Sequence, residues 1–397
     1  MIDFDIEKES QSLPMACIKV IGIGGAGGNT VNSMIDSNFR DIEFIVANTD
    51  AQALRISKAP HKIQLGVKST KGLGTGANPE IGKRAAEEDL DKILESVGDA
   101  DIVFIAAGMG GGTGSGASPV IAKLLREKGI LTVAIVTKPF TFEGKRRAKI
   151  AQESMENLKK EVDTLIVIPN QKLLEVVGDN VSMISAFEMI NDVLNQSVKG
   201  ISDIITKPGH INVDFADLKT IMKDMGFAIM GTGKAAGPNR SVEAALRAIS
   251  SPLLENMSIK GAKSVLLNIT GGQNLGIHEI NKAASVIYEQ ADEDANIIVG
   301  SVIDSQMTDE ICVTVIATGF TTQKQNESIN AIQEVKVQCT KLDTLVEEEM
   351  SQEKMSVSKE MSFKQTLEEQ LKENKIDAED LDVPAFLRQE YSQKEEQ

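Results

Sequence analysis

The glycine-rich stretch GMGGGTGSG, residues 108–116, is the part of the sequence best suited to hold a phosphate group. It follows the apolar run DIVFIAAG at 101–108, which is typical of a buried strand. Glycines let backbone N–H groups approach an anion closely, and a helix that begins behind the loop adds a favourable dipole. Gly116 is followed by Ala117 and Ser118, so the lysine of a P-loop is missing. The stretch predicts a phosphate site of another kind.

A second glycine loop, VIGIGGAGGN at 20–29, contains the pattern GxGxxG at Gly22, Gly24 and Gly27. Alone it fits a dinucleotide-binding turn, in which Asp50 would meet a ribose, or a strand-to-helix turn without a ligand. Two such loops in one sheet favour a longer polyphosphate, because both would lie outside the carboxyl ends of the strands. A triphosphate held by backbone amides and two helix N-termini needs no P-loop lysine, and magnesium would supply the compact positive charge.

The elements that must position these loops alternate, between residues 16 and 170, as short β-branched runs and segments of helical period. Such runs are typical of buried parallel strands, so the sequence predicts a doubly wound α/β domain with a mostly parallel sheet. A crossover helix is expected at 121–130, where apolar residues share one face. The predicted strands span residues 17–24, 43–50, 101–108, 130–140 and 163–170.

A long helix and a smaller domain are expected next. Apolar residues recur every three or four positions from 183 to 206, which predicts one long and largely buried central helix. An amphipathic helix at 275–291 among strand-like runs predicts a smaller α+β domain. Those runs lie at 264–271, 296–303 and 311–320.

The C-terminal part has a different composition. Beyond Phe320 the apolar periodicity fades and Glu, Lys, Gln and Ser predominate, so residues 321–380 are predicted to form a disordered linker. An apolar island, LDVPAFLRQEY at 381–391, interrupts the polar tail. It predicts a peptide, within residues 381–397, that binds a partner.

Composition excludes several classes of function. The net charge is −16 and aromatic residues make up 4% of the chain with no Trp, so nucleic acid is not expected as a partner. Three widely spaced cysteines favour neither a disulfide framework nor a zinc site. The N-terminus has no apolar core like that of a signal peptide, and no apolar run is as long as a membrane span. We therefore expect a cytoplasmic protein without direct membrane insertion.

The stretch GGGTGSG at 110–116 resembles the signature of the tubulin and FtsZ superfamily. The resemblance covers roughly residues 16–320, and the ending DVPAFLR is similar to the C-terminal peptide of the bacterial cell-division FtsZ family, to which we assign the chain. The other segments similar to FtsZ motifs occur in the same order: NTDAQAL at 48–54, GTGANPEIG at 74–82, TKPFTFEGKRR at 137–147 and INVDFADL at 211–218.

This resemblance implies a GTP and GDP site made by both glycine loops. An amide or carboxylate that accepts from the guanine N1–H separates guanine from adenine, and the sequence leaves open whether Asn191 or Asp192 does so. One departure is Gln171, where the family commonly has Asp; a missing negative charge there would alter how the cation or nucleotide is handled. The implied GTP-binding residues are Gly24, Gly25, Ala26, Gly27, Gly28, Asn29, Gly111, Gly112, Thr113, Gly114, Glu143, Arg147, Phe187, Asn191 and Asp192.

The catalytic groups are implied to come from another copy of the chain. By resemblance, Asn212, Asp214 and Asp217 form a loop that enters the nucleotide site of the neighbouring subunit, where the two carboxylates orient the attacking water. Without the resemblance, Asp214 and Asp217 approximate a helix capping box and would have only a structural role. The motif order favours the catalytic role.

The resemblance as a whole implies a GTPase that polymerises head to tail into filaments of the cytokinetic ring at mid-cell. Membrane-anchoring and regulatory division proteins would bind Asp382, Val383, Pro384, Phe386, Leu387 and Arg388. Two alternatives are a NAD-dependent oxidoreductase that uses only the first loop, and a structural filament that binds nucleotide without hydrolysing it. The expected divisions are an N-terminal extension (1–15), a GTP-binding domain (16–182), a central helix (183–206), a C-terminal α+β domain (207–320), a linker (321–380) and the terminal peptide (381–397).

Overall fold

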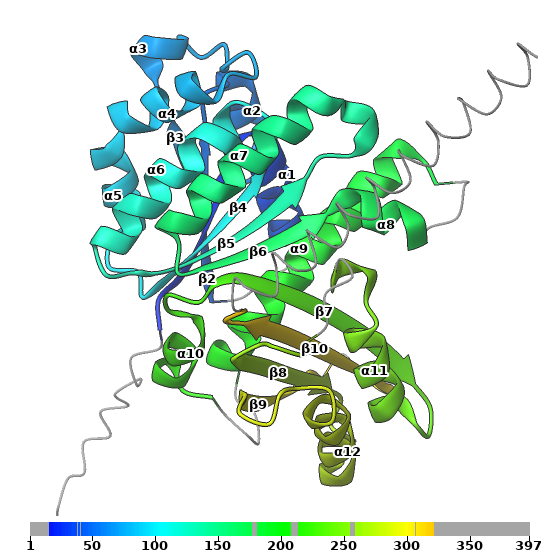
Figure 1. Cartoon of the computed structure of the whole chain (residues 1–397). Coiled ribbons are helices and arrows are strands. Elements are labelled where there is room, and N and C mark those ends of the chain that lie inside the picture. The colour runs from blue at the N-terminus through cyan, green and yellow to red at the C-terminus, as the bar shows by residue number, and fades with distance from the viewer. Residues whose placement is uncertain are drawn as a thin grey trace, which may run out of the picture. The chain divides into compact units, whose positions relative to one another are not determined.

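The computed structural model describes residues 16–320, apart from 38, 40, 177–180, 208–212, 255–258 and 306. Within this part, ten strands form one sheet in the order β3-β2-β1-β4-β5-β6-β7-β10-β8-β9 (Figure 1). Strands β1 to β6 are parallel to their neighbours, as the apolar runs predict. The strands are β1 (Ile18–Ile23), β2 (Ile42–Asn48), β3 (His61–Gln64), β4 (Ile102–Gly108), β5 (Leu131–Lys138), β6 (Thr164–Pro169), β7 (Gly226–Ala236), β8 (Ser264–Gly271), β9 (Asn296–Ile303) and β10 (Glu310–Thr318).

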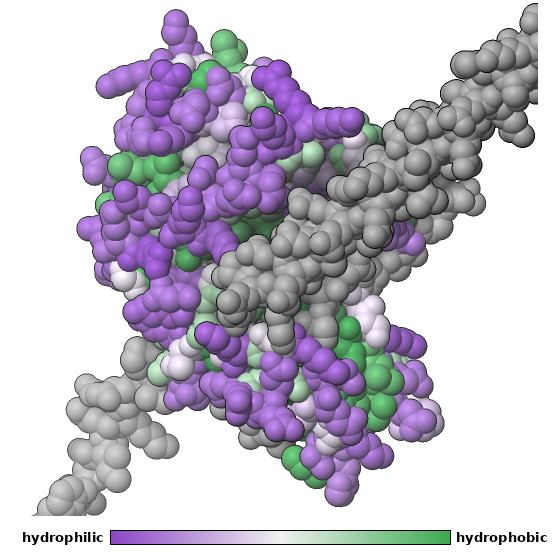
Figure 2. Space-filling view, viewed as in Figure 1, coloured by the Kyte–Doolittle hydropathy of each residue, from purple (hydrophilic) through white to green (hydrophobic). Residues whose placement is uncertain are grey.

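Helices cover both faces of the parallel half, which confirms the predicted doubly wound arrangement. Strand β1 is buried along its whole length, because successive side chains enter two different cores. One core contains side chains of α1 (Gly24–Asp36), α9 (Met183–Thr206) and α10 (Phe215–Met222). The other contains side chains of α4 (Pro79–Glu88), α5 (Leu90–Val97), α6 (Thr113–Glu127) and α7 (Lys145–Glu161). The outward sides of α4, α6 and α7 are largely hydrophilic (Figure 2).

The sheet continues into the second half through β7. Three residue pairs join it in parallel to β6, from Thr164↔Gly226 to Ile166↔Ala228. On its other side β7 pairs with β10 in antiparallel direction. Helices α11 (Arg240–Ile249) and α12 (Ile277–Tyr288) bury their apolar sides against this half. The predicted α+β part is therefore present, although the hydrogen-bonded sheet does not stop between the halves.

The long helix α9 packs against both halves of the molecule. Near its start, Thr30 of α1 donates to Asn191 Oδ1 at 3.2 Å, and Asn195 donates to Ser33 at 2.9 Å. Near its end, the buried Asn268 side chain of β8 donates to the Gly200 carbonyl at 2.9 Å. With 24 residues the helix is about 36 Å long, so one rigid element connects the α1 region to β8.

Five shorter helices complete the described chain: α2 (Ala51–Ile56), α3 (Val67–Thr70), α8 (Asn170–Val176) and the 3₁₀ turns η1 (Thr141–Glu143) and η2 (Pro252–Leu254). Among the residues described, no helix combines the length and apolar character needed to cross a membrane.

Candidate functional site

Both glycine loops lie at the carboxyl end of the parallel strands. The first follows β1 and opens α1, and the second follows β4 and opens α6. Strands β1 and β4 are neighbours, with Ile23 beside Ala107, and the chain leaves them toward opposite sides of the sheet. This is the topological switch point, where ligands of open α/β sheets bind.

The glycines of the first loop fall into two groups: some pack closely against the sheet, and others leave the backbone open to solvent. Gly24 has a φ of +74°, which favours glycine, and Gly24, Gly27 and Gly28 are buried. A Cβ at Gly27 would lie 2.2 Å from the Ala106 carbonyl oxygen, so only glycine lets α1 approach β4 this closely. Gly25, Ala26 and Asn29 are exposed, and a Cβ at Gly25 would meet no atom within 4 Å. These three residues form the open side of the loop.

The second loop shows the same division and packs on the first. A Cβ at Gly24 would lie 3.1 Å from the Gly114 backbone nitrogen, so the two loops are in contact. Gly112, Thr113 and Gly114 are buried, whereas Gly111 is partly exposed and has open space where a Cβ would point. Among the glycines of the two loops, Gly25 and Gly111 leave the backbone open to a ligand.

The helices behind the loops start without side-chain caps. Neither α1 nor α6 has a capping side chain or an acidic residue in its first turn. By contrast, Asp50 caps α2 and Asn78 caps α4. The first N–H groups of a helix need an acceptor and carry partial positive charge. Two uncapped helix starts at adjoining glycine loops suit a polyphosphate that supplies the missing acceptors.

Glu143 and Arg147 lie together beside the second loop. Arg147 Nη1 donates to Glu143 Oε2 at 2.6 Å, and the other carboxylate oxygen accepts from the Phe140 N–H at 3.0 Å. A Cβ at Gly110 would lie 2.9 Å from the Arg147 carbonyl oxygen, which places the start of α7 against this loop. The structure thus brings both predicted residues to the same edge as the glycines.

The start of α9 closes the site on the side of the first loop. Phe187 is 40% exposed and meets the buried Phe140 edge to face, with ring centroids 5.6 Å apart. Asn191 is partly buried and holds Thr30 of α1, whereas Asp192 is exposed. Thr30 directly follows the first loop, and Asn191 and Phe187 lie one turn apart on α9. Phe140 then connects Phe187 to Glu143. The predicted nucleotide residues on these elements thus lie at one edge of the sheet.

Two polar side chains follow β6 at this edge: Asn170, which the sequence analysis did not select, and Gln171, which stands where the family commonly has Asp. Asn170, directly after β6, is 4% exposed, and its Oδ1 has no hydrogen-bond partner among the described residues. A buried oxygen of this kind is able to accept a hydrogen bond from a ligand or from water. In the sequence, the position of Asn170 directly after a strand-like apolar run could have indicated that it lies at the site. Gln171 Oε1 accepts from both the Thr141 N–H, at 3.2 Å, and the Thr141 hydroxyl, at 3.0 Å, so its amide oxygen ties α8 to η1.

Asp214 and Asp217 lie at the other end of the sheet. Asp214 caps α10, its carboxylate accepting from the Asp217 N–H at 2.8 Å, and both side chains are exposed. The Met222 carbonyl at the end of α10 accepts from Thr164, the first residue of β6, at 2.5 Å. Helix α10 is therefore attached at the amino end of the strands (Figure 1). Asn212 and the peptide residues Asp382 to Arg388 lie outside the described residues.

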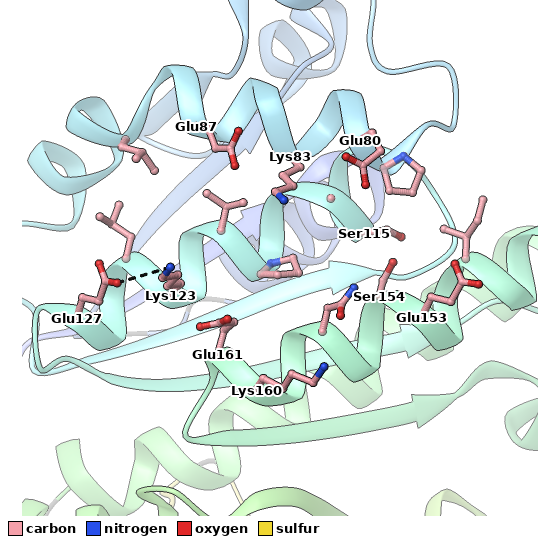
Figure 3. A pocket seen from close by; sticks show the side chains of 18 residues that line it. Glu80, Lys83, Glu87, Ser115, Lys123, Glu127, Glu153, Ser154, Lys160 and Glu161 are labelled. Atoms are coloured by element: carbon pink, nitrogen blue, oxygen red, sulfur yellow. Dashed lines mark ion pairs between the residues drawn. The ribbon is translucent and has the colours of Figure 1, made fainter.

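A separate cleft of about 760 Å³ lies between α4, α6 and α7 (Figure 3). Gly116 faces α4 here, since a Cβ would lie 2.0 Å from the Pro79 carbonyl oxygen. Gly114, on the opposite side of α6, faces the end of β4, where a Cβ would lie 2.6 Å from the Gly108 carbonyl oxygen. The cleft walls mix glutamates such as Glu80 and Glu153 with lysines such as Lys83. None of the predicted nucleotide residues lines this cleft.

Comparison with known proteins identifies this architecture. The profile of the Tubulin/FtsZ family GTPase domain matches residues 17–178, and that of the FtsZ family C-terminal domain matches residues 226–321. The structure of an empty FtsZ dimer from M. jannaschii is 42% identical with a TM-score of 0.74, and the match covers 78% of this chain and 89% of that one. The chain belongs to the tubulin/FtsZ family. It is accordingly a tubulin-like GTPase that binds GTP and GDP.

A more distant structure shares the fold. The GDP-bound CetZ1 monomer from Haloferax volcanii is 23% identical, with a TM-score of 0.67, and the match covers 79% of this chain and 99% of that one. Family membership also makes the oxidoreductase alternative wrong. Asp50, which that alternative would place on a ribose, accepts from the Gln52 and Ala53 N–H groups and caps α2.

Substitution by alanine should affect stability at the packed Gly27 and nucleotide binding at the exposed Gly25 of the first loop. Gly27→Ala puts a methyl group against the Ala106 carbonyl, and we expect it to reduce the free energy of unfolding by about 1–3 kcal/mol. Gly25→Ala meets open space, so the melting temperature should not fall, while GTP affinity drops on the order of tenfold, as for one lost hydrogen bond. Thermal melts and nucleotide titrations measure both. Unchanged GTP affinity in folded Gly25→Ala would contradict the assignment of the open side.

Proposed function

We propose that this GTPase polymerises head to tail and hydrolyses GTP between subunits, forming filaments of the cytokinetic ring at mid-cell in the cytoplasm. The observation that supports the proposal is the separation of the two sets of predicted site residues within one chain. The predicted nucleotide residues lie at the carboxyl end of the parallel strands, and Asp214 and Asp217 lie on a helix attached at the amino end. Two copies stacked end to end would bring the halves together.

The separation can be estimated along α6. This helix begins at the second glycine loop, and its Arg126, one residue before its end, forms an ion pair with Asp224, which follows α10. With 15 residues, α6 is about 22 Å long. Asp214 is at the other end of α10, which has 8 residues and is about 12 Å long, so even a helix that ran straight back would leave Asp214 roughly 10 Å from the second loop. A carboxylate acts on a reacting water at hydrogen-bond distance, so we infer that Asp214 serves the GTP of another chain. The M. jannaschii relative described as an FtsZ dimer supports association between copies.

At a junction between two chains, the carboxylates would position the water that attacks GTP. Asp214 and Asp217 are exposed, so they are accessible to a neighbour's nucleotide, and Asn212 would complete the loop. The carboxylates accept hydrogen bonds from the water that attacks the γ-phosphate and hold it in line. The capping bond from the Asp217 N–H fixes one Asp214 oxygen, and the other lone pairs remain available for water. Capping and catalysis are thus compatible roles.

Recognition of the nucleoside can be divided among the residues around the site. The exposed ring of Phe187 offers a face for the base, and we assign guanine reading to Asn191 because it faces α1 while Asp192 points to solvent. Asn170 Oδ1 would accept from a ribose hydroxyl.

Substitution Asn191→Leu should lower the preference for GTP over ATP in a competition titration, because it removes the side chain proposed to read guanine. Asp192→Leu should leave that preference unchanged. The reverse outcome would transfer the role to Asp192.

Magnesium would reach the site with the nucleotide. In the described chain no three His, Cys, Asp or Glu side chains are grouped closely enough to hold a metal ion. Mg²⁺ keeps several waters and is commonly held by substrate phosphates with one or two protein ligands, so the open glycine loops fit a nucleotide-borne ion. When bound, the ion neutralises phosphate charge. A titration that finds tight Mg²⁺ binding without nucleotide would contradict this assignment.

Substitution Asp214→Asn tests the shared site more sharply than alanine, because asparagine is an equally good helix N-cap. It keeps α10 intact and removes the charge that polarises the water. We expect GTP affinity to be unchanged and phosphate release to fall at least about 100-fold, the usual share of a positioned acid or base. Mixing with the wild type should slow wild-type filaments as well. The control is Asp294→Asn, which changes another exposed aspartate and should leave turnover unchanged. Wild-type turnover in Asp214→Asn would overturn the proposal.

The C-terminal peptide is proposed to tether filaments to membrane-anchoring and regulatory division proteins through Asp382, Val383, Pro384, Phe386, Leu387 and Arg388. Apolar residues in a polar tail fit short-peptide recognition. Deleting residues 381–397 should leave GTP-dependent sedimentation of filaments unchanged and abolish their mid-cell localisation in cells. A matched control replaces the seventeen residues with a polar sequence of equal length and charge, and mid-cell rings formed by either variant would contradict the proposal.

A further inference from the structure

Two buried threonine hydroxyls lie against each other at the second glycine loop. Thr49 directly follows β2, and Thr113 is the first residue of α6. Their Oγ1 atoms are 2.7 Å apart, so one hydroxyl donates a hydrogen bond to the other. A Cβ at Gly24 would lie 3.3 Å from the Thr113 Cβ atom. The pair of hydroxyls therefore reaches the place where the two glycine loops meet.

Thr49 is held in place by contacts that do not involve its hydroxyl. Its carbonyl accepts from the Gly74 N–H and from the Thr70 hydroxyl, each at 3.3 Å. Strand β2, which ends one residue before it, is paired on one side with β1 and on the other with β3. The Thr49 side chain is 0% exposed. Its hydroxyl is thus a fixed group against which the Thr113 hydroxyl can be oriented.

The surroundings decide which of the two hydroxyls donates. If Thr113 donated to Thr49, the Thr49 proton would have no acceptor within hydrogen-bond distance among the described residues, and an unsatisfied buried donor costs stability. If Thr49 donates, the proton that is left over belongs to Thr113. Thr113 is 9% exposed and lies two residues after Gly111, where the backbone is open to a ligand. A phosphate oxygen is a strong acceptor, so a bound nucleotide favours the second arrangement.

We propose that Thr49 is a positioning residue for the nucleotide phosphates: its hydroxyl donates to Thr113 Oγ1 and so directs the Thr113 proton to a phosphate oxygen. This inference rests on the assignment of Thr113 to the nucleotide. A hydroxyl that accepts one hydrogen bond is a stronger donor of the next, and it no longer rotates freely. Because Thr49 is fully buried, its effect on the nucleotide passes through Thr113.

A double-mutant cycle on GTP affinity, measured with the dilute full-length chain, tests this coupling. Thr113→Ala removes the donor to phosphate and should weaken GTP binding about tenfold or more, because hydrogen bonds to charged groups are strong. Thr49→Ala should weaken it on the order of fivefold, as for one neutral hydrogen bond. The double variant should bind GTP no more weakly than Thr113→Ala does. Losses that multiply would overturn the positioning role.

Two further variants separate the Thr49 hydroxyl from packing. Thr49→Ser loses the same methyl group as Thr49→Ala but keeps the hydroxyl, so it should recover most of the affinity; equal losses in both variants would overturn the proposal. Thr132→Ala removes another fully buried threonine, whose hydroxyl donates to the Ile130 carbonyl at 3.0 Å, at the amino end of β5. GTP affinity should be unchanged in Thr132→Ala, and a loss as large as that of Thr49→Ala would contradict a specific role for Thr49.

The Thr113→Ala variant separates the inference from the assignment on which it rests. Wild-type GTP affinity in Thr113→Ala would show that Thr113 does not bind the nucleotide, and the assignment itself would fail. If Thr113→Ala binds GTP weakly while Thr49→Ala binds it as the wild type does, only the positioning role of Thr49 fails. Because affinity is measured on the dilute chain, these outcomes do not depend on whether hydrolysis is shared between subunits.

Discussion

The common direction of β1, β4, β5 and β6 is the constraint on which the rest of the molecule depends. Parallel strands bring all their carboxyl ends to one edge, and the loops that follow these four strands supply the two glycine loops, Glu143 and Asn170. Because β1 and β4 are neighbours, their loops pack on each other and open two uncapped helices toward the same space. Polyphosphate binding without a P-loop lysine follows from this arrangement.

Because these strands run in one direction, their amino ends lie at the opposite edge of the sheet, where α10 is attached. Helices α6 and α9 run from the nucleotide edge to the region of α10 and β9, and their packing keeps both ends at a constant separation. If the proposed roles of the residues at the two edges hold, a rigid separation of this kind leaves each chain an incomplete enzyme, and the reaction takes place at the junction between chains. In the account proposed above, hydrolysis is thereby a property of the assembled state.

Much of this fold could be predicted from the sequence, because buried parallel strands and the long helix have strong apolar patterns. The predicted helix at 183–206 coincides with α9, and the strands at 101–108 and 163–170 agree with β4 and β6. Strand β7 was missed because it is rich in Gly and Ala; a Cβ at Gly231 would lie 2.0 Å from the Ala248 carbonyl oxygen of α11, so the residues there are small for close packing. The division of glycines into buried and open ones, and the orphan oxygen of Asn170, depend on contacts between distant segments and could not be predicted from local patterns. The predicted domain boundaries and the terminal peptide stay predictions.

The central claim is that the active site is shared between copies, and turnover per subunit as a function of protein concentration tests it most directly. Phosphate release and bound GTP would be measured on the same dilution series at saturating nucleotide. The account predicts that the rate per subunit falls steeply toward zero below a threshold concentration while each subunit still holds GTP, because association between subunits is linked to concentration by mass action. A rate per subunit that stays constant on dilution would show that one chain completes the reaction alone, and would contradict the account.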